Sequence, residues 1–379
     1  MFENINIEEI DINITNKCNL FCNHCSFNSS YKDDSELPFE MVRKIIDWAH
    51  DNSVQDIHIT GGEPTLHKNF DEIIAYAVSH FEDTRLITNG YDIDICLLER
   101  LKSYGLKNIM FSVDGTREFH NNIRGADDSF ERVLDTVKKA VDFGFKVRVN
   151  AVAQVSNYLS IPKLLKQVDK MKIDVFSVFA YTPTGRNYKN KISSVLNAIE
   201  WIELYNLMKT ASEECDCEVV IEKNFIYAED GYSPSEEYKR GAGCHSLIIN
   251  CDYLMILSNG DVYPCVIFTD KDCAYGNIYE KSLNEILSNP MNMDIYRNFE
   301  NKNHACSSCF QYSKCRGGCR AFAFAVDNNW GKKDPRCQDP NIFFPVCLML
   351  KENIHTLKKD GRSDNVYYGK NSHEKGVPC

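Results

Sequence analysis

The chain has 379 residues, of which 43% are hydrophobic and 26% are charged, enough for one large domain and a smaller one. Its net charge is −11 and no run is rich in lysine or arginine, which argues against nonspecific nucleic-acid binding, because neutralising phosphates needs a basic face. The N-terminal segment lacks the features of a signal peptide, and no stretch of transmembrane length is free of charges. We therefore expect a cytoplasmic protein that binds neither nucleic acid nor a membrane.

Strand-like and helical segments alternate through the first half of the chain. Apolar helical stripes begin near Pro38, Phe70, Phe130 and Ile161. Between them lie runs typical of β-strands, at residues 10–15, 57–60, 85–88, 108–113, 146–153 and 175–180. About six strand–helix repeats predict an α/β fold with parallel strands and crossover helices. Periodicity alone does not separate an open sheet from a barrel.

The pattern changes after residue 180. Pro183 and Gly185 mark a loop, a helix is expected at 198–210, and residues 227–243 are polar and linker-like. From Cys244 the chain is dense in cysteine with short elements, and its end is polar. We predict a core domain at 1–210, a bridging helix and linker at 211–243, a cysteine-rich domain at 244–350 and a tail at 351–379.

Seventeen cysteines without an export signal call for an explanation. Disulfide frameworks are typical of short secreted chains, whereas clustered cysteines in a reducing compartment more often bind metal. An odd number also fits poorly with complete pairing. Metal binding is therefore the favoured interpretation for the clustered cysteines, while Cys96, in a helical segment, is expected in the core.

Two motifs follow the first two predicted strands. Cys18, Cys22 and Cys25 form C-x3-C-x2-C, and three such thiolates can hold three corners of a cubane iron–sulfur cluster while one iron stays open. The second motif is Gly61-Gly62-Glu63-Pro64, which by itself would be consistent with a turn. Together the motifs resemble the radical S-adenosylmethionine (SAM) superfamily.

That resemblance implies a partial (βα)6 barrel and a [4Fe–4S] cluster whose open iron binds SAM. Electron transfer from the cluster, supplied by a donor such as a flavodoxin or ferredoxin, would cleave SAM into methionine and a 5′-deoxyadenosyl radical. The cofactor carries the difficult chemistry, while the protein binds and orients it.

The resemblance also implies SAM contacts. Glu63 would accept a hydrogen bond from the amino group of SAM, and Ser112 and Arg124 would contact its carboxylate, because a guanidinium can pair both oxygens. The alternative for that pair is an N-cap serine and a surface arginine. His24 would lie near the adenine. The full predicted set is Gly61, Gly62, Glu63, Pro64, Asn89, Ser112, Arg124 and Asn150.

The downstream cysteines resemble the SPASM domain, the cluster-bearing extension of radical SAM peptide maturases and their relatives. By position, a first auxiliary [4Fe–4S] cluster would use Cys244, Cys251, Cys265 and Cys319. A second would use Cys306, Cys309, Cys315 and Cys337. The alternative is a pair of zinc sites, since C-x2-C with further cysteines also fits zinc. Cys347 is a candidate spare ligand, and Cys379 has no assigned role.

Two departures from the related enzymes matter. Anaerobic sulfatase maturases carry an aspartate base directly after the cysteine of the G-x4-C motif, where this chain has Val266, which cannot take a proton. Many peptide maturases also carry an N-terminal winged-helix module that grips a leader peptide. Fewer than twenty residues precede Cys18, so we expect leader binding to use the barrel, the SPASM surface or a separate partner.

Three functions remain open from the sequence. The leading hypothesis is a radical SAM enzyme that modifies a ribosomally made peptide, by a thioether or carbon–carbon crosslink or another oxidation. The second keeps the chemistry with a small substrate, such as a haem precursor or a sugar. The third is a non-enzymatic iron–sulfur electron carrier, which would have no need for a SAM pocket.

Overall fold

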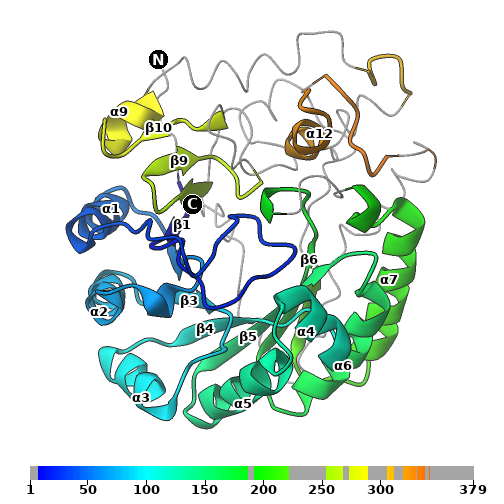
Figure 1. The fold of residues 1–379 in the computed structure, drawn as a ribbon, viewed down its shortest axis with the longest axis horizontal. Coiled ribbons are helices and arrows are strands. Elements are labelled where there is room, and N and C mark those ends of the chain that lie inside the picture. The colour runs from blue at the N-terminus through cyan, green and yellow to red at the C-terminus, as the bar shows by residue number, and fades with distance from the viewer. Residues whose placement is uncertain are drawn as a thin grey trace, which may run out of the picture.

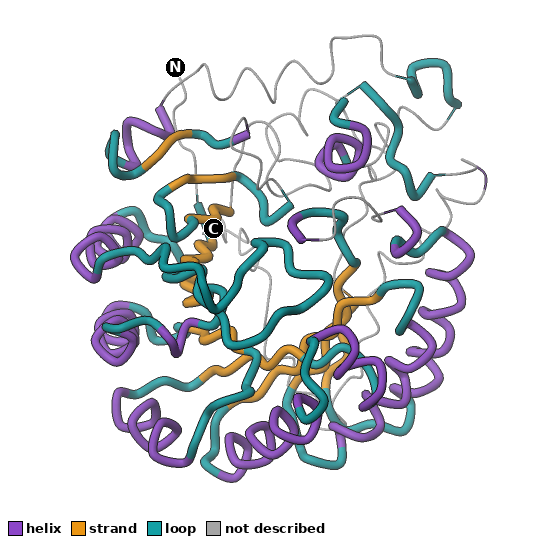
Figure 2. The backbone as a smooth tube through the Cα atoms, viewed as in Figure 1, coloured by secondary structure: helices purple, strands orange, loops and turns teal. Residues whose placement is uncertain are grey.

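The structure is a computed structural model that describes residues 7–186, 192–221, 253–267, 273–288, 305–310, 319–329, 331–337 and 341. Its centre is a curved sheet with helices on the outer side (Figures 1 and 2). Within the described residues the strands are β1 (Glu9–Asn13), β2 (Asp56–Thr60), β3 (Arg85–Thr88), β4 (Asn108–Ser112), β5 (Lys146–Ala153), β6 (Val175–Ala180), β7 (Glu218–Ile221), β8 (Tyr253–Ile256), β9 (Asp261–Tyr263) and β10 (Gly276–Asn277).

The helices connect these strands in the order that the sequence predicts. They are α1 (Phe39–Asp51), α2 (Phe70–His80), α3 (Ile95–Tyr104), α4 (Arg117–Arg124), α5 (Ser129–Asp142), α6 (Ile161–Asp169), α7 (Ala198–Ser212), α9 (Leu283–Ser288) and α12 (Arg320–Asp327), with short 3-10 turns at Pro64–Leu66, Tyr158–Ser160 and Ile192–Ser194. Each of β1 to β6 is followed by at least one helix, so the partial (βα)6 barrel is confirmed.

The sheet runs in the order β10-β9-β8-β1-β2-β3-β4-β5-β6-β7. Strands β1 to β7 are parallel, and β8 pairs with β1 in the same direction. Strand β9 is antiparallel to β8, and β10 is antiparallel to β9. Two features differ from the sequence prediction. Strand β7 forms inside the segment predicted as a linker, and β8 to β10 of the cysteine-rich region continue the barrel sheet.

Alternation along the strands separates an apolar face from a polar one. Ile10 and Ile12 of β1 and Ile57 of β2 are fully buried in the main core, together with the predicted stripe of α1 that includes Val42 and Ile46. Burying each such side chain contributes about 1.5–3 kcal/mol to folding. The intervening positions face the concave side and carry polar side chains, which makes the lumen of the barrel hydrophilic.

The main prediction that fails at this level concerns Cys96. This residue lies on α3 and is exposed rather than part of the core. Its position follows from the helix stripe, because Leu97, Leu98 and Leu101 occupy the buried face of α3. No helix among the described residues is long and apolar enough to cross a membrane.

Candidate active site

The three cysteines of the C-x3-C-x2-C motif lie in the loop between β1 and α1. Cys18 and Cys22 are buried and form a small cluster with Leu20, against which Cys25 and Tyr91 pack. The Leu20 N–H donates to Cys18 Sγ (3.5 Å). The structure therefore brings the three predicted thiols together at the C-terminal edge of the strands, where parallel α/β folds bind ligands.

The double glycine after β2 presses against the start of this loop. The Gly62 N–H donates to Thr15 O (2.6 Å) and the Glu63 N–H to Lys17 O (2.8 Å). A β-carbon on Gly61 or Gly62 would lie closer than 3.0 Å to these carbonyl oxygens. Only glycine permits this approach of two backbones. The close approach that the two glycines allow is therefore a contact with the cysteine loop itself.

Glu63 fastens the turn after β2 to the end of β3. Its carboxylate is buried and accepts hydrogen bonds from Thr88 Oγ1 (2.8 Å), from the Asn89 N–H (2.9 Å) and from Thr65 Oγ1 (2.8 Å). Burial raises the pKa of Glu63, while these hydrogen bonds oppose the rise. Pro64 is buried at the start of the following turn. The role of Glu63 toward an amino group stays a prediction.

Two predicted residues contact the cysteine sulfurs directly. Asn89 Nδ2 lies 3.8 Å from Cys18 Sγ, and Arg124 Nη1 lies 3.7 Å from Cys22 Sγ. Arg124 is the last residue of α4 and is only 8% exposed. The alternative of a surface arginine is therefore wrong.

Asp114, which the sequence analysis did not single out, orients Arg124. Arg124 Nη2 lies 2.6 Å from Asp114 Oδ2, and His24 Nε2 lies 3.5 Å from the same oxygen. Burial raises the pKa of Asp114, but the Arg124 guanidinium and His24 outweigh it and hold that pKa below its usual range. Its position in the sequence, two residues beyond the C-terminal end of β4, is not by itself specific for such a role.

The donor set fits an iron–sulfur cluster and a polar ligand beside it. Burial raises the pKa of Cys18 to about 12, and burial also raises that of Cys22. Binding of iron would therefore release thiol protons. His24 Nδ1 and Arg124 Nε are buried without a hydrogen-bond partner among the described residues. Buried polar atoms are normally paired, so a polar ligand at this place would satisfy them.

Ser112 and Asn150 are neighbours on the concave face. They are register partners on β4 and β5, and the following Val113 N–H donates to Asn150 O (2.8 Å). Arg148 Nε donates to Asn150 Oδ1 (3.0 Å). Both predicted side chains therefore face the lumen, while no contact between them and the cysteines is described.

Five of the eight predicted auxiliary ligands lie in the described part of the chain, namely Cys265, Cys306, Cys309, Cys319 and Cys337. The Cys309 N–H donates to Cys306 O (2.8 Å), so these two share a tight turn. Cys244, Cys251 and Cys315 lie outside the described residues, as do Cys347 and Cys379.

A second acidic residue, Asp334, joins two of these cysteines. Its Oδ2 accepts the Cys319 N–H (2.8 Å) and its carbonyl accepts the Cys337 N–H (2.9 Å). Arg336 Nη2 pairs with the carboxylate at 2.6 Å, and both side chains are fully buried. The guanidinium also lies over the Phe322 ring, 4.1 Å from its centroid. The predicted ligands of two different clusters therefore contact one carboxylate-bearing residue.

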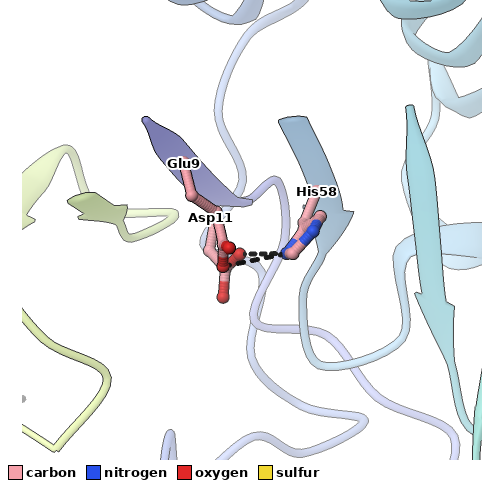
Figure 3. Close-up of side chains that lie close together, drawn as sticks. All are labelled: Glu9, Asp11 and His58. Atoms are coloured by element: carbon pink, nitrogen blue, oxygen red, sulfur yellow. Dashed lines mark hydrogen bonds and ion pairs between the residues drawn. The ribbon is translucent and has the colours of Figure 1, made fainter. Parts of the chain in front are cut away.

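A separate polar group lies on the concave face near the start of β1. Glu9, Asp11 and His58 point toward one another (Figure 3), with ligand atoms within 4.8 Å. Arg85 Nη1 lies 2.7 Å from His58 Nε2. Because a guanidinium only donates, Nε2 accepts, and the imidazole proton sits on Nδ1, 2.6 Å from Asp11 Oδ1. That proton occupies the position a metal would need, so the group is a hydrogen-bonded network.

Comparison with known families agrees with this geometry. Residues 12–167 match the Radical SAM superfamily, and residues 244–310 match the SPASM iron–sulfur cluster-binding domain. The chain carries a radical SAM domain and a SPASM domain. The first domain binds a [4Fe–4S] cluster and SAM, and the second binds iron–sulfur clusters.

Two curated relatives and one solved structure illustrate the similarity. The subtilosin biosynthesis protein AlbA of Bacillus subtilis is 29% identical over 73% of this chain, which spans 59% of that protein. The AdoMet-dependent heme synthase of Nitratidesulfovibrio vulgaris is 25% identical over 86% of this chain and 90% of its own length. Streptococcus suis SuiB, bound to its precursor peptide SuiA, shares the fold with a TM-score of 0.73 and 22% identity, over 88% of this chain and 76% of SuiB.

Proposed function

We propose that this chain is a radical SAM enzyme that modifies a ribosomally made peptide, with its reactive cluster on Cys18, Cys22 and Cys25. The observation that carries the proposal is that Cys25 packs against the buried Cys18 and Cys22, with nitrogen donors of Asn89 and Arg124 on the sulfurs of Cys18 and Cys22. When bound there, the cluster supplies the electron that cleaves SAM to methionine and a 5′-deoxyadenosyl radical.

The surrounding residues would bind and orient SAM. Arg124, held by Asp114, and Ser112 would receive the SAM carboxylate, since planar guanidinium donors suit two oxygens. Glu63 would accept from the amino group, and His24 would stack near the adenine. The proposed SAM-binding set is Gly61, Gly62, Glu63, Pro64, Asn89, Ser112, Arg124 and Asn150.

The SPASM cysteines would hold two auxiliary clusters. The buried Asp334–Arg336 pair supports a rigid environment for Cys319 and Cys337. Cys319 is assigned to the first cluster and Cys337 to the second. The proposed ligand sets are Cys244, Cys251, Cys265 and Cys319 for the first, and Cys306, Cys309, Cys315 and Cys337 for the second.

The names of the relatives support a peptide substrate. AlbA takes part in biosynthesis of a bacteriocin, and SuiB binds a precursor peptide. The second candidate is a small-molecule reaction, because the heme synthase aligns over 90% of its own length. In either case we infer a cytoplasmic reaction in which a flavodoxin or ferredoxin supplies the electron.

The test begins with anaerobically reconstituted enzyme, reductant and SAM. We expect 5′-deoxyadenosine from the wild type and none from Cys18→Ala, while Cys96→Ala, which changes an exposed cysteine on α3, behaves as the wild type. Absence of 5′-deoxyadenosine from the reconstituted wild type would contradict the proposed activity.

Substrate class is tested by mass spectrometry. Short peptides encoded beside the gene are co-expressed with the wild type or with Cys18→Ala, and a Cys18-dependent mass change identifies the substrate. If all such peptides stay unchanged while a tetrapyrrole precursor is converted by the same enzyme, the small-molecule function is correct.

A further inference from the structure

The loop after β6 carries a motif that the proposed function leaves unexplained, Thr182-Pro183-Thr184-Gly185-Arg186. It starts at the C-terminal edge of the barrel, where Tyr181 N–H continues the sheet by donating to Ala153 O (3.0 Å). From there the loop reaches the cysteine loop, which extends from β1 across the view toward β6 in Figure 1. Two segments more than 150 residues apart in sequence thus lie in contact.

Arg186 contacts the cysteine loop at four points. Its backbone N–H donates to Cys25 O (3.0 Å), and Nη1 donates to Cys22 O (2.9 Å). Nη2 donates to Ser29 O, and Nε lies 3.4 Å from Asn28 Oδ1. One side chain therefore spans residues 22 to 29, a range that includes two of the three cysteines.

One of these contacts leads to a cysteine sulfur. Ser29, whose carbonyl receives Arg186 Nη2, donates its own N–H to Cys25 Sγ (3.3 Å). Ser29 is 2% exposed, and its hydroxyl donates to Asn16 Oδ1 (2.6 Å). The position of the Cys25 sulfur therefore depends on a residue that Arg186 holds by its carbonyl.

The ring of Phe21 stacks on the guanidinium of Arg186. The guanidinium carbon lies 3.4 Å from the ring centroid, a cation–π contact that favours arginine over lysine because the two groups are planar. Phe21 directly precedes Cys22, and the Asn23 N–H that follows donates to Ile123 O (2.9 Å). The middle of the loop is therefore held by α4 on one side and by Arg186 on the other.

Gly185 allows this contact. Its φ of +68° lies in the left-handed region, and a β-carbon there would lie closer than 3.0 Å to Cys25 O and Ser26 O. A side chain at position 185 would push the two segments apart. Gly185 allows the loop after β6 to approach the cysteine loop closely, and Arg186 then binds the cysteine loop by hydrogen bonds.

We propose that Arg186 is a positioning residue that fixes the loop of Cys22 and Cys25 in the geometry that retains the reactive cluster. This inference rests on the proposed function, which places that cluster on Cys18, Cys22 and Cys25. Groups that orient metal ligands without touching the metal typically change metal affinity by 10- to 100-fold when they are lost.

The experiment measures the release of iron to a chelator from anaerobically reconstituted full-length enzyme, together with the change that SAM causes in the electron paramagnetic resonance spectrum. Arg186→Lys keeps the charge but loses the planar set of donors. We expect about four irons per chain to leave roughly 10-fold faster or more, with a weaker SAM-dependent spectral change and an unchanged rate for the remaining irons.

Two further variants complete the design. Gly185→Ala disturbs the same contact without altering Arg186. It should therefore show the same faster release of about four irons as Arg186→Lys. Arg100→Lys is the matched control, because Arg100 pairs with Asp71 between α3 and α2 (3.1 Å) on the outer helices, and it should match the wild type.

The outcomes distinguish failure of the positioning role of Arg186 from failure of the cluster assignment to Cys18, Cys22 and Cys25. Wild-type iron release and spectra in both Arg186→Lys and Gly185→Ala would overturn the inference, as would equal acceleration for all irons, which would indicate general unfolding. If Cys18→Ala keeps the SAM-dependent signal of the wild type, the assignment of the reactive cluster fails first, and the inference fails with it.

Discussion

Asp114 and Arg124 form a buried ion pair beside the three cysteines, and they show what a sequence does and does not reveal about single residues. Arg124 was expected from the motif resemblance, because an arginine after the fourth strand occurs in similar enzymes. Asp114 was not, although it lies two residues beyond Ser112, because an acidic residue after a strand has no signature of its own. Its role depends on the fold bringing α4 back to β4.

We expect Arg124→Gln to lower the free energy of unfolding by about 3 kcal/mol, because it leaves the Asp114 carboxylate buried without its cationic partner. The double variant Arg124→Gln/Asp114→Asn should regain part of this loss, since the unpaired charge is gone. The amide oxygen introduced by Asp114→Asn can still accept the Val152 N–H that now donates to Asp114 Oδ1 (2.9 Å). Urea unfolding of the wild type, Arg124→Gln, Asp114→Asn and the double variant gives the coupling energy between the two residues. Additive effects of the two substitutions would contradict the pairing.

His120 gives the site a defined response to acid. It is buried on α4, where Nδ1 accepts the Asp114 N–H (3.1 Å) and Nε2 lies 3.0 Å from Ser129 Oγ. Burial, together with the Arg124 charge, lowers the pKa of His120 to about 3. Below a pH of about 6.5 the unfolded chain therefore binds a proton that the folded protein does not, down to about pH 3.

We expect the stability of the wild type to fall in this window by up to about 1.4 kcal/mol per pH unit more than that of His120→Gln, because glutamine does not titrate. Urea unfolding at pH 7, 6 and 5 gives the slope of the unfolding free energy against pH for each protein. The difference between the two slopes is the contribution of His120. His50→Gln, at an exposed position of α1, serves as the control for replacing a histidine by glutamine outside the site. Parallel slopes for His120→Gln and the wild type would contradict the assignment.

At the scale of elements, strand prediction succeeded wherever an apolar run was bounded by turn residues. The predicted runs at 85–88, 146–153 and 175–180 coincide with β3, β5 and β6. Helix α4 was missed for a physical reason, since its buried face carries His120 and Arg124 beside Ile123 and so lacks an apolar stripe. Strand β7 was missed because its short apolar run lies in the segment 211–243, which was predicted as a bridging helix and linker from its polar residues 227–243.

Cross-strand polar pairs on the concave face could not be predicted, because they depend on register. Asp11 is the register partner of His58, and His58 is the partner of Arg85. Asp11 also accepts a hydrogen bond from Tyr253 on β8 (2.7 Å). This carboxylate therefore links the first barrel strand to the first described strand of the cysteine-rich region.

We expect Asp11→Asn to lower the free energy of unfolding by about 3 kcal/mol, because it removes one partner from a largely buried charged network. The control is Asp51→Asn, at an exposed position of α1, which should change stability by less than about 0.5 kcal/mol. Equilibrium dialysis of the folded apoprotein against Zn²⁺ or Mn²⁺ provides an independent check. Tight metal binding that Asp11→Asn abolishes would show that the group is a metal site instead.

At the scale of the whole molecule, the two domains share one sheet. The parallel pairing of β8 with β1 places the strand that leads through β9 toward Cys265 next to the strand that leads to Cys18. The sequence predicted a radical SAM core and a SPASM domain as successive units, because cysteine spacing changes sharply at Cys244. It could not reveal the shared sheet, since hydrogen bonds between distant strands leave no periodic signal. The arrangement brings the reactive and auxiliary regions into one framework.

Iron content tests the cluster assignment for the whole chain. Three [4Fe–4S] clusters predict about twelve irons and twelve sulfides per chain after anaerobic reconstitution. Cys18→Ala should remove about four irons and the SAM-dependent spectral change together, whereas Cys306→Ala should remove about four and leave that spectral change intact, because Cys306 is assigned to an auxiliary cluster. Zinc in the cysteine-rich region would instead give about four irons in the wild type, with zinc lost in Cys306→Ala. Metal analysis of the three proteins by mass spectrometry therefore distinguishes auxiliary clusters from zinc sites, since only the first assignment makes iron disappear in steps of four from both variants.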